Sequence, residues 1–130
     1  MTDAETTARQ LLDEIQEATA AKDADRLAAL FADDVVLFGT AAANIGRNES
    51  IAYLHRVLAQ DGTIRWHWKH VEPLLSEPEV ICFAVVGTVG FEFDGEPDGG
   101  RDSFRLTILA VRDAGRWRVR HFHGSVPQID

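Results

Sequence analysis

The sequence predicts an α+β fold, in which a strongly curved antiparallel sheet carries three N-terminal helices on its concave face. Three observations support this prediction. Up to about residue 61, most apolar residues recur at the three- and four-residue spacing of helices. From residue 64 onward they alternate as in strands. The longest apolar run contains Gly87 and Gly90, at which a long strand can bend.

The length predicts one domain, over residues 1–130. A chain of 130 residues falls within the roughly 100 to 200 residues of an ordinary domain. Its composition, 45% hydrophobic and 26% charged, is typical of globular proteins. Because a domain of this size buries roughly two-thirds of its unfolded surface, we expect it to fold without disulfides or a structural metal.

Two helices are expected before the first strand. Residues 2–21 repeat apolar side chains on one helical face, which is formed by Ala8, Leu11, Leu12, Ile15, Ala18 and Thr19. Thr2 and Glu5 have the spacing of a capping box, and Asp3 is an alternative cap. A short second helix is expected to be capped by Asp25. Its apolar side is formed by Leu27, Leu30 and Phe31.

A short strand and a third helix follow. Residues 35–38 are apolar and rich in β-branched side chains, which is typical of a strand. After a loop, Asn48 is expected to cap a helix that ends near Gly62. The apolar face of this helix is formed by Ile51, Leu54, Val57 and Leu58, with Tyr53 beside it.

Four further strands are expected to form a meander over residues 64–71, 80–93, 103–111 and 117–126. Pro73 and Pro78 are expected to bracket a loop. Asp94-Gly95 and Gly99-Gly100 mark an acidic hairpin connection. Because side chains alternate along a strand, one side of the first of these strands is formed by Ile64, Trp66, Trp68 and His70.

Charge and cysteine content limit the partners and the compartment. The net charge is −8, from 13 basic and 21 acidic residues, so nucleic acid and anionic membranes are repelled. No apolar run approaches the roughly 18 residues of a membrane span. Cys82 is the single cysteine and is expected to be a buried, inert thiol. We therefore expect a cytoplasmic protein with neither nucleic acid nor membrane as a partner.

Two segments resemble those of a known superfamily. Leu30-Phe31-Ala32-Asp33-Asp34, followed by an apolar strand, resembles the helix-to-strand junction of the nuclear transport factor 2-like superfamily, which includes ketosteroid isomerases. The segment 115–127 contains Trp117, a His-Phe-His run, Ser125 and Pro127. It resembles the last hairpin of the calcium/calmodulin-dependent protein kinase association domain. Nearly the whole chain is similar to the SnoaL-like branch of this superfamily.

This resemblance implies a cone-shaped, cystatin-like fold. It also implies a cavity between the sheet and the helices. Members of the superfamily are usually homodimers or larger rings built through the outer face of the sheet. The resemblance therefore implies a homodimer here, with a small molecule as the further partner.

The ketosteroid isomerases provide one comparison for the site. The segment from Asp102 to Leu106 resembles theirs, in which the Asp donates a hydrogen bond to the developing oxyanion, so Asp102 becomes a candidate catalytic residue. By position, however, their general base falls near Gly39 and their oxyanion tyrosine near Ile15. Without a base to take the proton, steroid isomerisation by that mechanism is not expected.

The kinase association domain provides a second comparison. Its pocket presents arginines that hold small carboxylates, and the corresponding positions here are Gly124 and Ile108. Since both guanidinium groups are replaced by carbon or by no side chain, the resemblance predicts a cavity for uncharged, hydrophobic ligands.

The same resemblance places the candidate side chains on the cavity face. It turns Asp102 and Arg120 toward the cavity, where they are predicted to pair across the strands, either as a structural ion pair or as an active-site pair. Apolar alternation alone predicts the opposite for the last strand, with Trp117 and Val119 inward and the arginines outward. The side chains expected to contact a ligand are Tyr53, Trp68, Phe104, Leu106, Ile108 and Phe122.

Histidine and tryptophan pairs leave alternatives open. His121 and His123 share a strand face, but a metal would need a third ligand from His67 or His70. Packing at an interface is favoured, and no metal is expected. Trp66 and Trp68 form an aromatic stripe, for which core or dimer packing is favoured over ligand stacking.

Two functions follow from these expectations. The first is binding of a small molecule in a hydrophobic cavity. As an enzyme, such a protein would be a cofactor-independent isomerase, lyase or cyclase, with Asp102 as proton donor or oxyanion partner and Arg120 as its orienting residue. The second is a non-catalytic association module that uses the outer face of the sheet.

Overall fold

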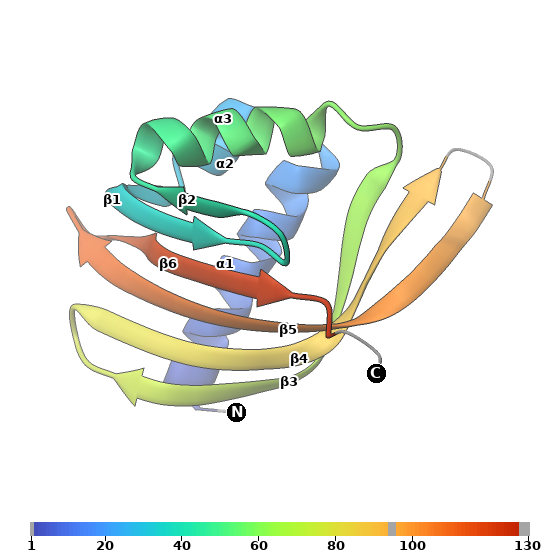
Figure 1. Cartoon of the computed structure of the whole chain (residues 1–130). Coiled ribbons are helices and arrows are strands. Elements are labelled where there is room, and N and C mark those ends of the chain that lie inside the picture. Colours follow the sequence, from blue (N-terminus) through green and yellow to red (C-terminus); the bar gives the residue numbers. More distant parts are fainter. Residues whose placement is uncertain (1, 94–95, 128–130) are drawn as a thin grey trace.

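The computed structural model describes residues 2–93 and 96–127, with side chains for 2–93 and 101–127. In chain order, the elements are α1 (Asp3–Ala20), α2 (Ala24–Ala28), β1 (Phe31–Phe38), β2 (Ala43–Ile45), α3 (Arg47–Leu58), β3 (Thr63–Ser76), β4 (Val80–Phe93), β5 (Glu96–Asp113) and β6 (Arg116–Ser125). The fold is the predicted α+β arrangement of N-terminal helices and a curved sheet (Figure 1).

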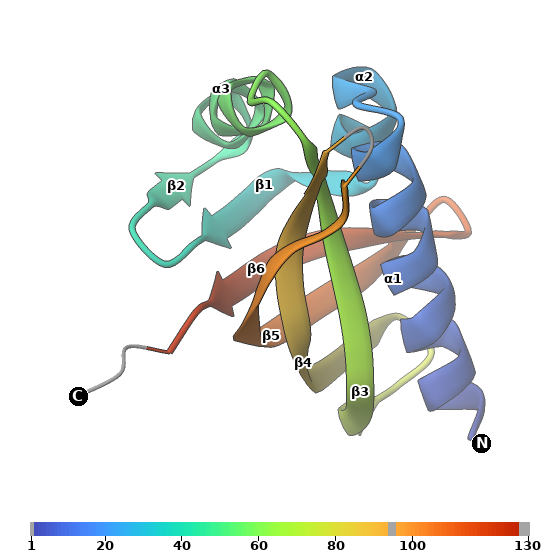
Figure 2. The ribbon, with the colours of Figure 1, turned by 90° about the vertical axis from the view of Figure 1, so that its right-hand side faces the viewer.

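The sheet has the strand order β2-β1-β6-β5-β4-β3. Strands β3 to β6 form the predicted antiparallel meander, and β1 lies parallel to β6. The short strand β2, which pairs with β1, was expected to be a loop. Helix α1 lies along the concave face of the sheet, and α2 and α3 lie at one end (Figure 2). None of the helices formed by the described residues is long and apolar enough to span a membrane.

The buried face of α1 is the one that its periodicity predicts. All six expected residues are buried, and they pack with the concave side of the sheet. Thr2 caps the helix as expected, since its Oγ1 accepts a hydrogen bond of 3.1 Å from the Glu5 amide. This contact fixes the start of the helix that covers the sheet.

The caps of the other two helices differ from those predicted. Asp23 rather than Asp25 caps α2, because its side chain accepts from the Arg26 amide at 3.0 Å. Helix α2 is also shorter, and Phe31 begins β1. Helix α3 begins after Gly46, without a side-chain cap, so Asn48 lies within its first turn.

Strand β3 is longer than predicted and contains an irregularity. It continues through Pro73 to Ser76, which is possible because β3 is an edge strand, where a missing amide donor is tolerated. The register shifts between Trp68 and His70. Val71 is therefore buried on the concave side, whereas His70, which alternation had placed inward, is exposed.

Gly87 permits the close contact between β4 and β3 at this irregularity. It pairs with Trp68, and a Cβ atom at Gly87 would lie 2.0 Å from the His67 backbone oxygen. The predicted bend in the long strand β4 is thus a site where one backbone approaches another. Gly90 stands next to a second register shift, between β4 and β5. The part of the predicted hairpin at Asp94-Gly95 lies outside the described residues.

Strand β6 combines the two conflicting predictions about its inward face. Phe122 pairs with Ile108 and Gly124 with Leu106, so both face the concave side as the resemblance predicts. A register shift beside Ala110 then brings Val119 inward as well, where it is fully buried. Arg120 lies at this shift. Because of this one irregular position, the start of β6 follows the alternation that its apolar residues predict. The end of β6 follows the alternation that the resemblance predicts.

Candidate functional site

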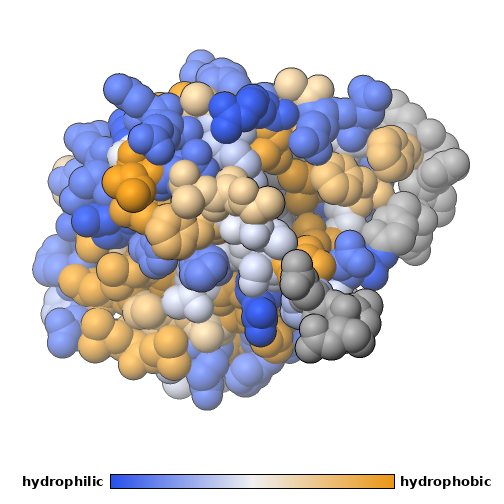
Figure 3. Space-filling view, in the orientation of Figure 1, coloured by the Kyte–Doolittle hydropathy of each residue, from blue (hydrophilic) through white to orange (hydrophobic). Residues whose placement is uncertain are grey.

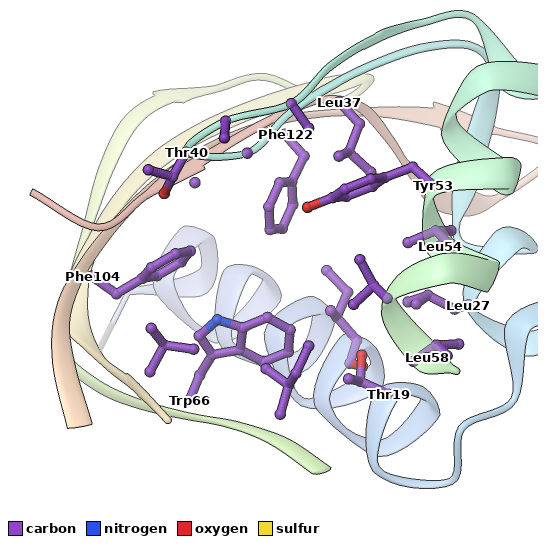
Figure 4. A pocket seen from close by; sticks show the side chains of 18 of the residues that line it. Thr19, Leu27, Leu37, Thr40, Tyr53, Leu54, Leu58, Trp66, Phe104 and Phe122 are labelled. Carbon is purple, nitrogen blue, oxygen red and sulfur yellow. The ribbon is translucent and has the colours of Figure 1, made fainter. Parts of the chain in front are cut away.

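A cavity of about 360 Å³ lies between the helices and the concave face of the sheet. Its walls come from α1, α2, α3, β1, β3, β4, β5 and β6 and from the turn between β1 and β2 (Figure 4). It is lined by Ile15, Thr19, Leu27, Phe31, Leu37, Gly39, Thr40, Ala41, Ala42, Tyr53, Leu54, Val57, Leu58, Ile64, Trp66, Val89, Phe91, Phe104, Phe122 and Gly124.

The lining is almost entirely carbon. Among the described residues, those that line the cavity include no Asp, Glu, Lys, Arg or His. Two of the polar side chains already have partners. Thr19 Oγ1 donates to the Ile15 carbonyl oxygen at 2.7 Å, and Thr40 Oγ1 accepts from the Val126 amide at 2.8 Å. The described part of the lining therefore offers no fixed charge with which to bind an ion.

Two polar groups in the cavity have no partner among the described residues. The Nε1–H group of Trp66 is buried and makes no hydrogen bond. The hydroxyl of Tyr53 likewise has no hydrogen-bond partner there. Both groups point into the cavity, Trp66 from β3 and Tyr53 from α3 (Figure 4). These are the positions at which an apolar cavity can recognise a polar atom.

Contacts to its backbone and to its ring hold Trp66 in place. The Gln16 side chain from α1 accepts from the Trp66 amide at 2.8 Å and donates to the Ile64 carbonyl oxygen at 3.0 Å. Trp68 stacks on the indole, with ring centroids 5.9 Å apart and planes at 14°. Phe104 lies against it at 6.4 Å. The direction of the Nε1–H group is consequently set by the protein.

The absence of side chains at two glycines makes room for the aromatic lining. A Cβ atom at Gly39 would lie 2.9 Å from the Tyr53 hydroxyl oxygen. At Gly124 it would lie 2.5 Å from Cζ of Phe104. Both positions, together with Ile15, line the cavity. The resemblance aligned polar groups of related pockets with four positions of this chain, and Gly39, Gly124 and Ile15 are three of them. The fourth, Ile108, is fully buried in the core.

Of the six side chains expected to contact a ligand, three line the cavity: Tyr53, Phe104 and Phe122. Trp68 lies outside the lining because its neighbour Trp66 covers the wall there. Leu106 and Ile108 are buried in the core beneath. Sequence reasoning noted Trp66 but did not assign it to the ligand. The spacing of Trp66 two positions from Ile64 could have indicated it, since both line the cavity.

Asp102 and Arg120 do not form the predicted pair. The β5–β6 ladder ends where Arg105 pairs with Ser125, and Asp102 lies beyond that end. Arg120 lies in the middle of the ladder, between the pairs Leu109–His121 and Ala110–Val119, so the two residues are roughly 20 Å apart along the strands. Arg120 instead forms an ion pair with Asp34 at 3.0 Å. Asp102 is exposed on the concave side, opposite Val89, and is not part of the cavity lining.

The outer face of the sheet carries a second group of apolar and aromatic side chains. Hydrophobic residues gather over part of β4 and β5 at the lower left of the molecule (Figure 3). Leu75 and Val86 are 42% and 50% exposed. On β1 and β6, Phe38 makes edge contacts with His121 and His123 at 5.3 and 5.4 Å. Within residues 2–93 and 101–127, no three His, Cys, Asp or Glu side chains are grouped as a metal site requires.

Solved structures with this fold carry names that point to different functions. A nuclear transport factor 2-like protein of unknown function from Pseudomonas putida KT2440 is 22% identical, with a TM-score of 0.81, covering 99% of this chain and 90% of that one. A protein from Xanthomonas campestris, named provisionally as a calcium/calmodulin dependent protein kinase II association domain, is 21% identical, with a TM-score of 0.82 and coverage of 95% and 88%.

A third structure, named provisionally as a scytalone dehydratase, comes from Novosphingobium aromaticivorans DSM 12444. It is 14% identical, with a TM-score of 0.81, covering 98% of this chain and 89% of that one. At these identities the similarity establishes the fold. No curated protein sequence matches the chain. The family model described as SnoaL-like domain matches residues 8–129, so the chain belongs to the SnoaL-like family.

Proposed function

We propose that this protein binds a small, neutral, mainly apolar molecule in the cavity between the helices and the sheet. The observation that carries the proposal is the lining, in which aliphatic and aromatic carbon surrounds the two unpartnered polar groups of Trp66 and Tyr53. An ionic ligand would lose its hydration without gaining an opposite charge, which costs several kcal/mol or more. A neutral ligand gains the hydrophobic contribution without that loss.

The volume limits the size of the ligand. An apolar cavity of about 150 Å³ is sufficient for benzene. The cavity here, at about 360 Å³, is roughly twice as large and lies at the lower end of the range for small-molecule sites. A compound with two fused rings is therefore the size class that we propose.

The lining supports binding more strongly than turnover. Among the lining side chains of the described residues, Tyr53 alone carries a proton that it can lose in water. A proton transfer at the cavity would therefore involve Tyr53, in a cofactor-independent isomerisation, elimination or cyclisation of a neutral substrate. Asp102 is not one of the lining residues, and we expect Asp102→Ala to leave ligand affinity unchanged.

A thermal-shift comparison tests the proposal. Tetralin, a neutral bicyclic hydrocarbon, is expected to raise Tm by roughly 5 °C at ten times its Kd, which corresponds to about 1.4 kcal/mol. Tetralin-2-carboxylate has the same rings and a negative charge, and we expect no shift at the same concentration. Stabilisation by the carboxylate but not by the hydrocarbon would contradict the proposal.

The outer face of the sheet supports a second candidate function, association with another copy of the chain. Its half-exposed apolar side chains, Leu75 and Val86 among them, make it the surface that a partner would cover. We propose a homodimer formed through this face. Light scattering measures the molar mass directly, and a monomer at all accessible concentrations would exclude the homodimer.

The thiol of Cys82 lies on this outer face of the sheet. It lies on β4 between the inward side chains of Ile81 and Phe83, and burial raises its pKa. Because the thiolate is the reactive form, iodoacetamide at about pH 8 should modify native Cys82 more slowly than Cys82 in the urea-unfolded chain. The two rates should approach each other as the pH rises past the raised pKa. Equal rates at about pH 8 would contradict this prediction.

A further inference from the structure

We propose that the ligand carries a neutral hydrogen-bond acceptor, a carbonyl or ether oxygen, that binds the Nε1–H group of Trp66. This inference rests on the proposed function and specifies the chemical class of its ligand. The group that carries it is the indole N–H of one lining residue, which has no hydrogen-bond partner among the described residues.

The Nε1–H group of Trp66 is a hydrogen-bond donor. It is a buried polar atom without a partner among the described residues, whereas the great majority of buried polar atoms in proteins have one. Figure 4 shows it directed into the cavity rather than into the surrounding core. An unmet donor at this place favours a ligand that supplies the missing acceptor, because the donor otherwise stays desolvated and unpaired.

Only a hydrogen-bond acceptor can pair with this group. An indole nitrogen carries one hydrogen and only donates, so the ligand atom must accept. Carboxylate and phosphate oxygens also accept, but among the described residues the lining holds no Lys, Arg or His to offset their charge. A neutral oxygen remains. The Tyr53 hydroxyl, which points into the same cavity from another wall, can donate to or accept from a second ligand atom.

Contacts within the protein fix the direction of the donor. The Gln16 amide holds the Trp66 backbone, and the stack with Trp68 holds its ring. A donor that is already oriented loses little side-chain freedom when the ligand binds. When two ligands differ only in an acceptor atom, the hydrogen bond should therefore make the ligand that carries the acceptor bind more tightly.

The experiment uses 1-tetralone and tetralin, which share a carbon skeleton and differ in one carbonyl oxygen. Calorimetry gives the Kd of each for the parent protein, for Trp66→Phe and for the control Trp117→Phe, which changes an indole that neither lines the cavity nor stacks on Trp66. We expect the affinity for tetralone relative to tetralin to fall about 3- to 10-fold in Trp66→Phe. The control should keep the parent ratio.

The outcomes separate the inference from the function beneath it. If both compounds bind the parent and Trp66→Phe leaves their ratio unchanged, the inference is overturned and the proposed binding function stands. If neither compound binds the parent, the proposed function is itself overturned, and the inference with it.

A second measurement needs no variant at the site. Saturating tetralone should shift the ¹⁵N-indole N–H resonance of Trp66 in the parent protein downfield, and tetralin should leave it near its ligand-free position. Trp68→Phe and Trp117→Phe assign the other two indole signals by their loss. A Trp66 signal that stays in place with saturating tetralone overturns the inference even where Trp66→Phe fails to fold.

Discussion

Replacing Gly87 with valine should lower the free energy of unfolding by about 3 kcal/mol or more. The reason is the contact between β4 and the irregular part of β3, where a Cβ atom would lie 2.0 Å from the His67 backbone oxygen. A backbone oxygen cannot rotate away as a side chain can, so the two strands must separate. Urea denaturation measures the effect, and the midpoint should fall by roughly 1–2 M.

Thr88→Val is the matched control for this prediction. Thr88 is the next residue along β4, is half-buried and pairs with His67. Valine has nearly the same shape as threonine, so the substitution should change stability by no more than about 0.5 kcal/mol. A Gly87→Val protein with the urea midpoint of the parent would show that β3 and β4 do not approach as described.

Replacing Val57 with tryptophan should fill part of the cavity and oppose ligand binding. Val57 lines the cavity from α3 and is half-buried, so a larger ring there takes space that the ligand needs. Loss of about 100 Å² of apolar contact corresponds to ~2.5 kcal/mol, or a roughly 100-fold rise in Kd. Calorimetry with tetralin measures this change.

The stability of the ligand-free variant provides a second readout. Filling a cavity with apolar atoms commonly adds about 0.5–2 kcal/mol. Val57→Trp should therefore have an unchanged or higher Tm while its affinity falls, a combination that general damage to the fold does not produce. Ala52→Trp, on the exposed side of the same helix, is the control and should bind tetralin like the parent. Retained affinity in Val57→Trp would place the ligand elsewhere.

The fold was predictable where a periodic pattern determines it. The buried face of α1 follows from its three- and four-residue spacing, and the order of β3 to β6 follows from alternation and turn signals. Local irregularities were not predictable in this way. The shifts beside Trp68 and Arg120 each insert one residue, and pairing with the neighbouring strand, rather than any pattern within the strand, determines where that residue falls.

The candidate site was predictable in its character but only partly in its residues. The expectation of a carbon-rich cavity came from Gly124 and Ile108, of which Gly124 lines the cavity and Ile108 is buried in the core. Trp68 was expected to contact a ligand, whereas the indole that lines the cavity is that of Trp66, on which Trp68 stacks. Pairing Asp102 with Arg120 was wrong because the sequence alone does not give the register of β5 against β6.

The contact of Gln16 with β3 has a consequence for how the protein behaves at high concentration. A strand at the border of a sheet normally leaves backbone donors and acceptors free to pair with another molecule, a common route to aggregation. The side-chain amide of Gln16 pairs with two backbone groups of this edge strand, the N–H of Trp66 and the carbonyl oxygen of Ile64. Edge-to-edge extension of the sheet is therefore blocked beside the cavity wall, and replacing Gln16 with leucine would leave that border open to fibril-like growth.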